Sequence, residues 1–136
     1  MRLLCDGLDV GEVAVAATFS ARLRGLLGER PVQRCLLLEP CGSIHTLGMA
    51  EPLEVAFCTA DLEVIEVRTV PPWRPLVAVR GTRSVLEAAA GVLSSRGIKA
   101  GSRLIVSSGG RPLKDRAARR QAALADGADG GRDARR

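Results

Sequence analysis

The chain has 136 residues, of which 46% are hydrophobic and 26% are charged, so it suffices for one domain with one substantial core. Charged residues or glycines break every apolar stretch, so we expect neither a membrane-spanning helix nor a signal peptide. These features predict a soluble, cytoplasmic protein whose four cysteines stay as thiols.

The net charge of +5 is concentrated near the C-terminus. From Arg111 to Arg136 there are eight basic and four acidic residues, which leaves residues 1–110 with a net charge of only +1. This pattern predicts a β-rich domain over residues 1–107 and a basic, disordered tail over residues 108–136. Nucleic-acid binding is therefore expected only through the tail, and the scarcity of aromatic residues argues against base stacking on the domain.

The first predicted elements are a hairpin and a short helix. Leu3–Cys5 and Val10–Ala17 are apolar segments on either side of the turn Asp6–Asp9, which has the Asp-Gly pair typical of hairpins. Leucines at spacings of three and four then predict a helix that begins at Ser20 and ends at Gly28.

The middle of the chain predicts a sheet. Cys35–Leu38 is a continuous apolar run, which is typical of a central strand buried on both faces. Further strands are expected at Ile44–Met49, Leu53–Cys58 and Val64–Val70, the last two forming a hairpin. The prolines of Pro71–Pro75 cannot sit inside a strand ladder, so this segment is predicted to be a rigid, exposed loop.

The last part of the domain predicts more strands and one more helix. Strands are expected at Leu76–Arg80, Ser84–Glu87 and Leu104–Val106. Between the last two, Ala88–Ser95 is predicted to be a short helix that stops before Gly97. The chain therefore predicts a β-rich α+β fold with one or two short helices.

Three ordered motifs resemble those of a known family. They are Arg24–Gly28, the long segment Ile44–Phe57, and Val85–Glu87 with the glycines at 91, 97 and 101 that follow it. Their order and spacing resemble the domain-of-unknown-function family 192 over roughly residues 13–106. The resemblance implies a compact single-domain β-barrel or sandwich with short helices, and a family with no established reaction.

Four positions depart from the family pattern. The family usually has Asp at the position of Glu54, an aromatic residue at Leu47, an acid at Ser102 and a glycine near Leu62. If those acids were catalytic, the changes would impair this chain, so either they are structural or this member has diverged.

His45 is the only histidine, and its ordinary pKa near neutrality makes it the first candidate for a general base. Glu54 is its expected partner. If Ile44–Met49 and Leu53–Cys58 are neighbouring strands, His45 and Met49 on one and Glu54 and Cys58 on the other could converge. The alternative, left open, is that His45 and Glu54 form a structural hydrogen-bonded pair.

The cysteines allow two further hypotheses. Cys35, Cys41 and Cys58 with His45 have the donors of a Cys₃His zinc site, but the close pair typical of such sites is absent, so no metal or other cofactor is predicted. Cys41 or Cys58 could also act as a nucleophile beside His45. The ordinary interpretation is that these cysteines are small core residues.

The loop residues offer binding candidates. Trp73, held among prolines, could anchor an interaction or fold back to cover the open end of the fold. Arg80 and Arg83, on either side of Gly81, could bind an anion or simply face solvent.

The preferred hypothesis is a non-catalytic domain that binds an unknown protein or small-molecule ligand. Its predicted contacts are His45, Met49, Glu54, Trp73, Arg80 and Arg83. One alternative is a small hydrolase- or isomerase-like enzyme with His45 as base and Glu54 as the orienting carboxylate. The other is nucleic-acid binding by the tail.

Overall fold

The computed structural model describes residues 1–29 and 31–108, and its strands form three sheets. The three-stranded sheet has the order β10 (Leu104–Ser107), β1 (Arg2–Cys5) and β2 (Leu8–Glu12). The five-stranded sheet has the order β3 (Ala14–Ala16), β4 (Leu36–Leu38), β9 (Ser84–Ala89), β6 (Leu53–Cys58) and β7 (Val64–Val70). The third is the pair β5 (Ser43–Ile44) and β8 (Val77–Ala78).

The five-stranded sheet is the centre of the fold. Every residue of β4 and β6 is buried, because both faces of the sheet are covered and their sequences are almost wholly apolar. The predicted central strand at Cys35–Leu38 is thus confirmed as β4. The predicted hairpin of Leu53–Cys58 with Val64–Val70 is confirmed as the antiparallel pair β6–β7.

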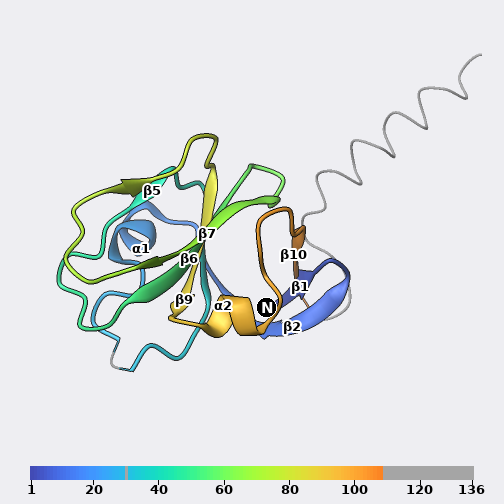
Figure 1. Cartoon of the computed structure of the whole chain (residues 1–136), viewed down its shortest axis with the longest axis horizontal. Helices are drawn as coiled ribbons and strands as arrows, with labels where there is room; N and C mark the ends of the chain where they lie inside the picture. The colour runs from blue at the N-terminus through green and yellow to red at the C-terminus, as the bar shows by residue number, and fades with distance from the viewer. Residues whose placement is uncertain (30, 109–136) are drawn as a thin grey trace, which may run out of the picture.

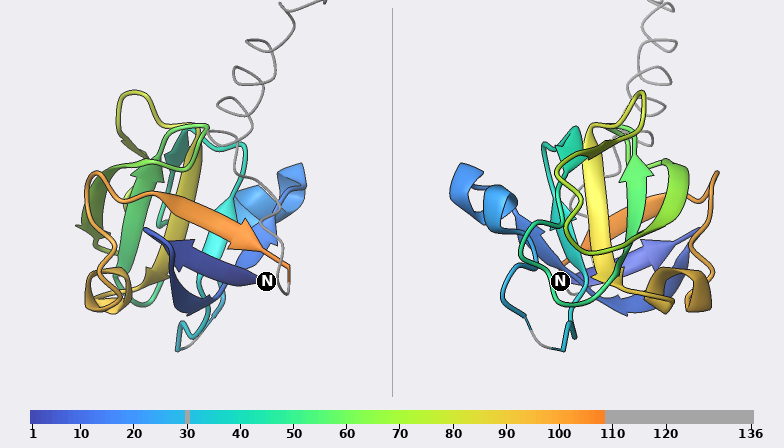
Figure 2. Two further views of the ribbon diagram at one scale, coloured as in Figure 1. Left: turned by 90° about the vertical axis from the view of Figure 1, so that its right-hand side faces the viewer. Right: turned by 60° about the vertical axis from the view of Figure 1, so that its left-hand side comes forward.

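Two hydrophobic cores lie on opposite faces of this sheet. On one face, Ala56 of β6 and Leu86 of β9 pack with the three-stranded sheet and with helix α2 (Val92–Ser95). On the other, Val55 and Phe57 of β6 pack with Ile44 of β5 and with the segment that follows helix α1 (Phe19–Arg24). Figure 1 shows this layering, and Figure 2 shows β1 and β10 running across the strands of the central sheet.

The N-terminal elements differ from the prediction in their bounds. The predicted strand Val10–Ala17 is split, because the Val13 N–H donates to Met1 O while the next N–H, of Ala14, donates to Cys35 O in the other sheet. The helix begins earlier than expected because Thr18 caps it, its side chain accepting from the Ala21 N–H. It also ends earlier, at Gly25, where φ is +52°.

Two further predictions were wrong in part. The expected strand Ile44–Met49 ends at Ile44, because Gly48 has φ +78° and the Met49 N–H donates back to Thr46 O. The expected helix Ala88–Ser95 starts only at Val92, because Ala88 and Ala89 extend β9 and pair with β6. Strand pairing overrides the helical propensity of these alanines.

The described residues bear out the β-rich fold with short helices. Within residues 1–29 and 31–108 the strand ladders remain in three separate sheets and do not close into a single barrel. No helix in this part of the chain is long and apolar enough to cross a membrane. Apart from Ser108, the predicted tail lies outside the described residues.

Candidate functional site

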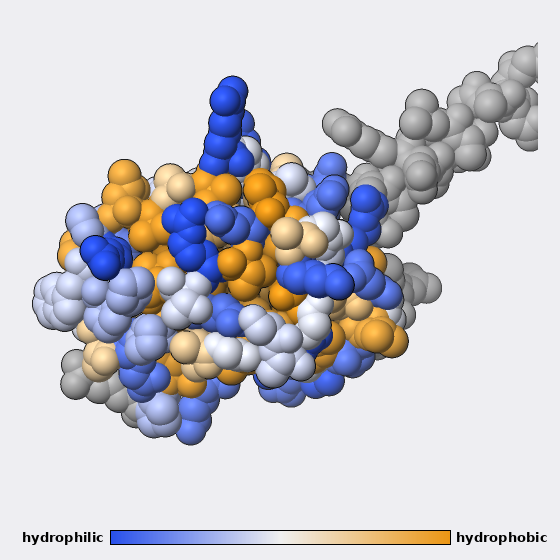
Figure 3. Space-filling view, viewed as in Figure 1, coloured by the Kyte–Doolittle hydropathy of each residue, from blue (hydrophilic) through white to orange (hydrophobic). Residues whose placement is uncertain are grey.

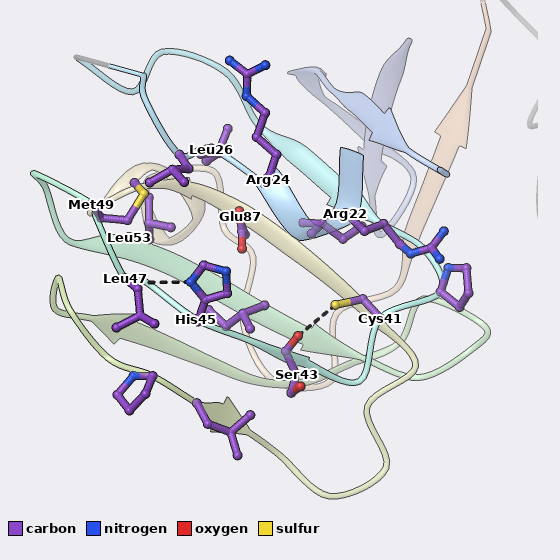
Figure 4. A pocket seen from close by; sticks show the side chains of 17 residues that line it. Arg22, Arg24, Leu26, Cys41, Ser43, His45, Leu47, Met49, Leu53 and Glu87 are labelled. Carbon is purple, nitrogen blue, oxygen red and sulfur yellow. Dashed lines mark hydrogen bonds between the residues drawn. The ribbon is translucent and has the colours of Figure 1, made fainter. Parts of the chain in front are cut away.

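A cavity of about 370 Å³ lies between the central sheet, α1 and the segment that follows β5 (Figure 4). Most of its wall is apolar, with Leu38 and Leu53 from the central sheet and Met49 next to Leu53 (Figure 4). The polar side chains in the lining are few: Arg22, Arg24, Cys41, Ser43, His45 and Glu87. Apolar walls with a few polar groups are typical of small-molecule sites.

Glu87 is the one carboxyl in this lining, and β9 places it there. Side chains alternate along a strand, so Val85 and Glu87 face the cavity side while Leu86 and Ala88 face the other core. Glu87 is only 3% exposed, and its Oε2 has no hydrogen-bond partner among the described residues. A buried polar atom without a partner is unusual and calls for a functional explanation.

Burial raises the pKa of Glu87 from 4.5 to about 7. The backbone N–H of Leu26 donates to the carboxyl and lowers its pKa, but by less than burial raises it. The carboxyl therefore changes its protonation state near neutral pH, where an ordinary glutamate is fully ionised.

The turn after α1 is shaped to approach this carboxyl. Gly25 has φ +52°, and a Cβ added there would lie 3.0 Å from Glu87 Oε2. Glycine is thus needed both for the backbone conformation and for the close contact. The turn brings the Leu26 amide to the carboxyl and makes Leu26 and Leu27 part of the cavity wall.

His45 projects into the cavity from the wall opposite Glu87 (Figure 4). Its Nδ1 accepts from the Leu47 N–H at 3.2 Å, so the neutral ring carries its proton on Nε2. The next residue, Thr46, is fully buried and holds this segment in place through its backbone and hydroxyl. The predicted ligand residues His45 and Met49 are therefore both in the cavity lining.

Arg22 and Cys41 form the side of the cavity next to α1. Arg22 donates from Nη1 to Ala17 O and lies close enough to Cys41 to influence its thiol. The Cys41 Sγ donates to Ser43 O at 3.1 Å, and burial raises the pKa of this thiol. Arg24 also lines the cavity, and the guanidinium groups of both arginines extend away from Glu87 (Figure 4).

Glu54 is on the opposite face of the sheet, and the structure does not bring it to His45. Its Oε1 accepts from the Ser94 N–H at 2.6 Å, and its Oε2 accepts from the Gly91 N–H and from Ser94 Oγ at 3.2 and 3.0 Å. Glu54 therefore holds the start of α2. The expected convergence was wrong because β5 pairs with β8, so the strand with His45 is not a neighbour of β6.

The cysteines are divided between the two cores. Cys35 and Cys58 pack in the core on the α2 side, whereas Cys41 and His45 line the cavity, so the four donors of a Cys₃His site are not assembled. Among the described residues there is no cluster of metal-ligating side chains. Burial raises the pKa of Cys58 to about 12, which leaves its thiol protonated and unreactive.

The other predicted contact residues lie on the surface. Trp73 is 67% exposed and does not fold back over the core, and Pro75 and Leu76, close after it, line the cavity mouth. In the space-filling view, apolar patches lie between hydrophilic residues over the face shown (Figure 3). Arg80 and Arg83 are exposed and lie outside the cavity lining.

The sequence of the domain matches a family model along almost its whole length. The model is that of the domain-of-unknown-function family 192, described as an uncharacterized ACR, and it matches residues 4–106. The chain belongs to this family. The resemblance expected from the three motifs is thus confirmed, and the Glu87 cavity lies within the family region.

Relatives of this family 192 chain include two archaeal UPF0127 proteins. The one from Pyrococcus furiosus is 29% identical over 98 residues, covering 68% of this chain and 84% of the relative. The one from Pyrococcus horikoshii is 30% identical over 90 residues, covering 62% and 78%. A crystal structure of a protein of unknown function from Novosphingobium aromaticivorans has a TM-score of 0.64 at 21% identity, covers 76% of this chain and 82% of that one, and supports the fold.

Glu87 is the site residue that sequence reasoning missed, although it belongs to one of the family 192 motifs. A signal for it was present. It is the only charged residue in the apolar run from Val85 to Val92, within a predicted strand. Charged side chains are rarely buried without a partner, so a carboxyl in such a run marks a candidate site.

Proposed function

We propose that this domain binds a small molecule in the cavity between Glu87 and His45. The observation that supports this most strongly is Glu87 Oε2, which is buried, has no partner among the described residues and faces the cavity. Leaving a buried acceptor or donor unpaired costs about 1–3 kcal/mol. A ligand that pairs with this atom recovers that free energy.

The size and composition of the cavity suit a small ligand. A volume of about 370 Å³ lies within the range of roughly 300–1,000 Å³ common for ligand pockets. Leu38, Leu53 and Met49 offer apolar contact to the body of the ligand, while Glu87 and His45 fix its polar end. Pro75 and Leu76, which follow the exposed Trp73 closely in the chain, also line the cavity, so in this proposal Trp73 contacts a ligand that extends outward.

Protein-observed NMR with a set of neutral, anionic and cationic fragments tests this proposal. Fragments that bind should shift the amide signals of residues 25–27, 45–49 and 87, and should leave those of α2 unchanged. Trp73 provides a second signal, because it is the only tryptophan and lies two residues before Pro75 of the cavity lining.

A matched pair of variants decides where the fragments bind. Cys41→Phe places a large side chain in the cavity and should abolish the shifts, whereas Ser95→Phe, exposed on α2, should not. His45→Ala should weaken binding and leave the melting temperature nearly unchanged, because His45 makes only a local hydrogen bond. Fragments that bind Cys41→Phe as well as the natural protein would contradict the proposal.

General acid–base catalysis is a second candidate, favoured by the Glu87 pKa of about 7. A group with such a pKa can both give and take a proton at neutral pH. In this version Glu87, not Glu54, is the acid or base, and His45 lies across the same cavity. Turnover of a bound fragment that is lost in Glu87→Gln while binding is retained would distinguish catalysis from binding alone.

A further inference from the structure

The polar side chains around Glu87 are mainly hydrogen-bond donors. His45 presents Nε2–H, because its Nδ1 is occupied by the Leu47 amide. Arg22 donates from its guanidinium to Ala17 O, and this group extends away from Glu87 (Figure 4). Glu87 supplies the one carboxyl of the lining, so the charged side chains of the wall are otherwise positive.

The elements packed around Glu87 give its carboxyl no cationic partner. α1 contributes Arg22 and Arg24, and the segments flanking β5 contribute Cys41 and His45. The neighbouring strands contribute the apolar side chains of Leu38 and Leu53. No cation is among the causes that shift the Glu87 pKa, and no salt bridge of the described residues includes Glu87. In this setting the protonated carboxyl is favoured, and it adds a donor at Oε2.

We propose that the ligand is a small carboxylate with an apolar body, held by Glu87 in its protonated form together with the Nε2–H donor of His45. The inference rests on the proposed function, because it names the chemical class that the cavity selects. The ligand carboxylate accepts from Glu87 Oε2–H, and the two carboxyls share one proton because like charges at this distance cannot both be ionised. The apolar body lies against Leu38, Leu53 and Met49.

Binding is therefore coupled to proton uptake. Below pH 7 the free protein already holds the proton, and above pH 7 the complex must take one up. The affinity for a carboxylate should fall about tenfold for each pH unit above 7. An amine would show the opposite dependence, because it needs Glu87 ionised.

Three probes of equal length separate these classes: hexanoate, hexanamide and hexylamine. Each is titrated into the full chain between about pH 6 and pH 8.5, where hexanoate is ionised because an ordinary carboxyl has a pKa of about 4. Calorimetry in two buffers of different ionisation enthalpy gives the number of protons taken up. At about pH 6 hexanoate should bind tightest and hexylamine weakest, and near pH 8.5 hexanoate should take up close to one proton.

Two variants complete the test. Glu87→Gln keeps a donor at the same place, so it should bind hexanoate with an affinity that does not change with pH and with no proton uptake. Glu63→Gln, an exposed glutamate away from the cavity, should behave like the natural protein.

The outcomes separate the ligand class from the site. Tighter binding of hexylamine, or hexanoate binding without proton uptake above pH 7, would overturn the carboxylate proposal. Cavity binding by neutral fragments but by none of the three probes would also overturn it and leave the proposed function standing. If none of the fragments or probes shows binding that Cys41→Phe removes, both the carboxylate proposal and the proposed function are overturned.

Discussion

Glu54 and Glu87 are buried carboxyls on the neighbouring strands β6 and β9, with opposite environments. Glu54 is 4% exposed and receives three hydrogen bonds from Gly91 and Ser94. Glu87 is 3% exposed and keeps one oxygen unpaired. Their side chains point to opposite faces of one sheet, which is why residues so similar in sequence context have different roles.

The stability of the domain should depend on pH through Glu87. In the folded protein Glu87 keeps its proton up to about pH 7, whereas in the unfolded chain it releases the proton near pH 4.5. The contribution of Glu87 to the unfolding free energy is therefore fully present below pH 4.5 and is lost as the pH rises through 7. From pH 4.5 to about pH 8, the unfolding free energy of the natural protein should fall by roughly 3 kcal/mol relative to Glu87→Gln. Urea unfolding of both proteins at several pH values measures this, and parallel curves would refute it.

Glu54→Ala should destabilise the fold, because it leaves the amides at the start of α2 without their acceptor. We expect a loss of about 2–4 kcal/mol in unfolding free energy, since hydrogen bonds to charged groups contribute more than neutral ones. Hydrogen exchange should become faster at Gly91 and Ser94. Fragment affinity under folding conditions should not change, and a selective loss of affinity would restore Glu54 to the site.

At the scale of elements, the cavity mouth depends on how two loops are joined. The backbone carbonyl oxygen of Thr46 accepts a hydrogen bond from the Trp73 N–H, and the Thr46 N–H donates to Arg74 O. The Thr46 hydroxyl donates to Pro71 O at 2.7 Å and accepts from the Arg74 N–H at 2.9 Å. The proline-rich loop is therefore fixed to the segment that positions His45.

Thr46→Val removes the hydroxyl and keeps the side-chain shape. It should cost about 1–3 kcal/mol, because the Arg74 N–H and Pro71 O lose a buried partner. Hydrogen exchange at Arg74 should accelerate. Thr82→Val is a suitable control, because it also removes a buried hydroxyl but one that bonds only within its own turn, to Val79 O. Equal exchange at Arg74 in both variants would contradict the role of Thr46.

Two strands could be predicted with their bounds from the local pattern. Leu53–Cys58 is buried throughout and almost wholly apolar, and Val64–Val70 is rich in β-branched residues. The segment after Ile44 could not be predicted, because its course depends on a side-chain acceptor at His45 and on Gly48. The candidate site was predicted in part, because His45 and Met49 line the cavity and Glu54 does not. The position of Glu54 could not be predicted, because the pairing of β5 with β8 is a long-range contact that the periodicity of the sequence does not encode.

At the scale of the whole molecule, the central sheet separates two cores with different tasks. The core on the α2 side is closed by Glu54 and by the three-stranded sheet. The core on the α1 side contains the cavity, and there Glu87 is, among residues 1–29 and 31–108, the one buried carboxyl with an unpaired oxygen. In this account the first core stabilises the domain and the second binds the ligand.

A crystal structure of the domain with its tightest-binding fragment tests this account most directly. A polar atom of the fragment should lie within about 2.6–3.2 Å of Glu87 Oε2, with the apolar part of the fragment against Leu38 and Leu53. A fragment bound elsewhere, with Glu87 Oε2 still unpaired, would contradict it.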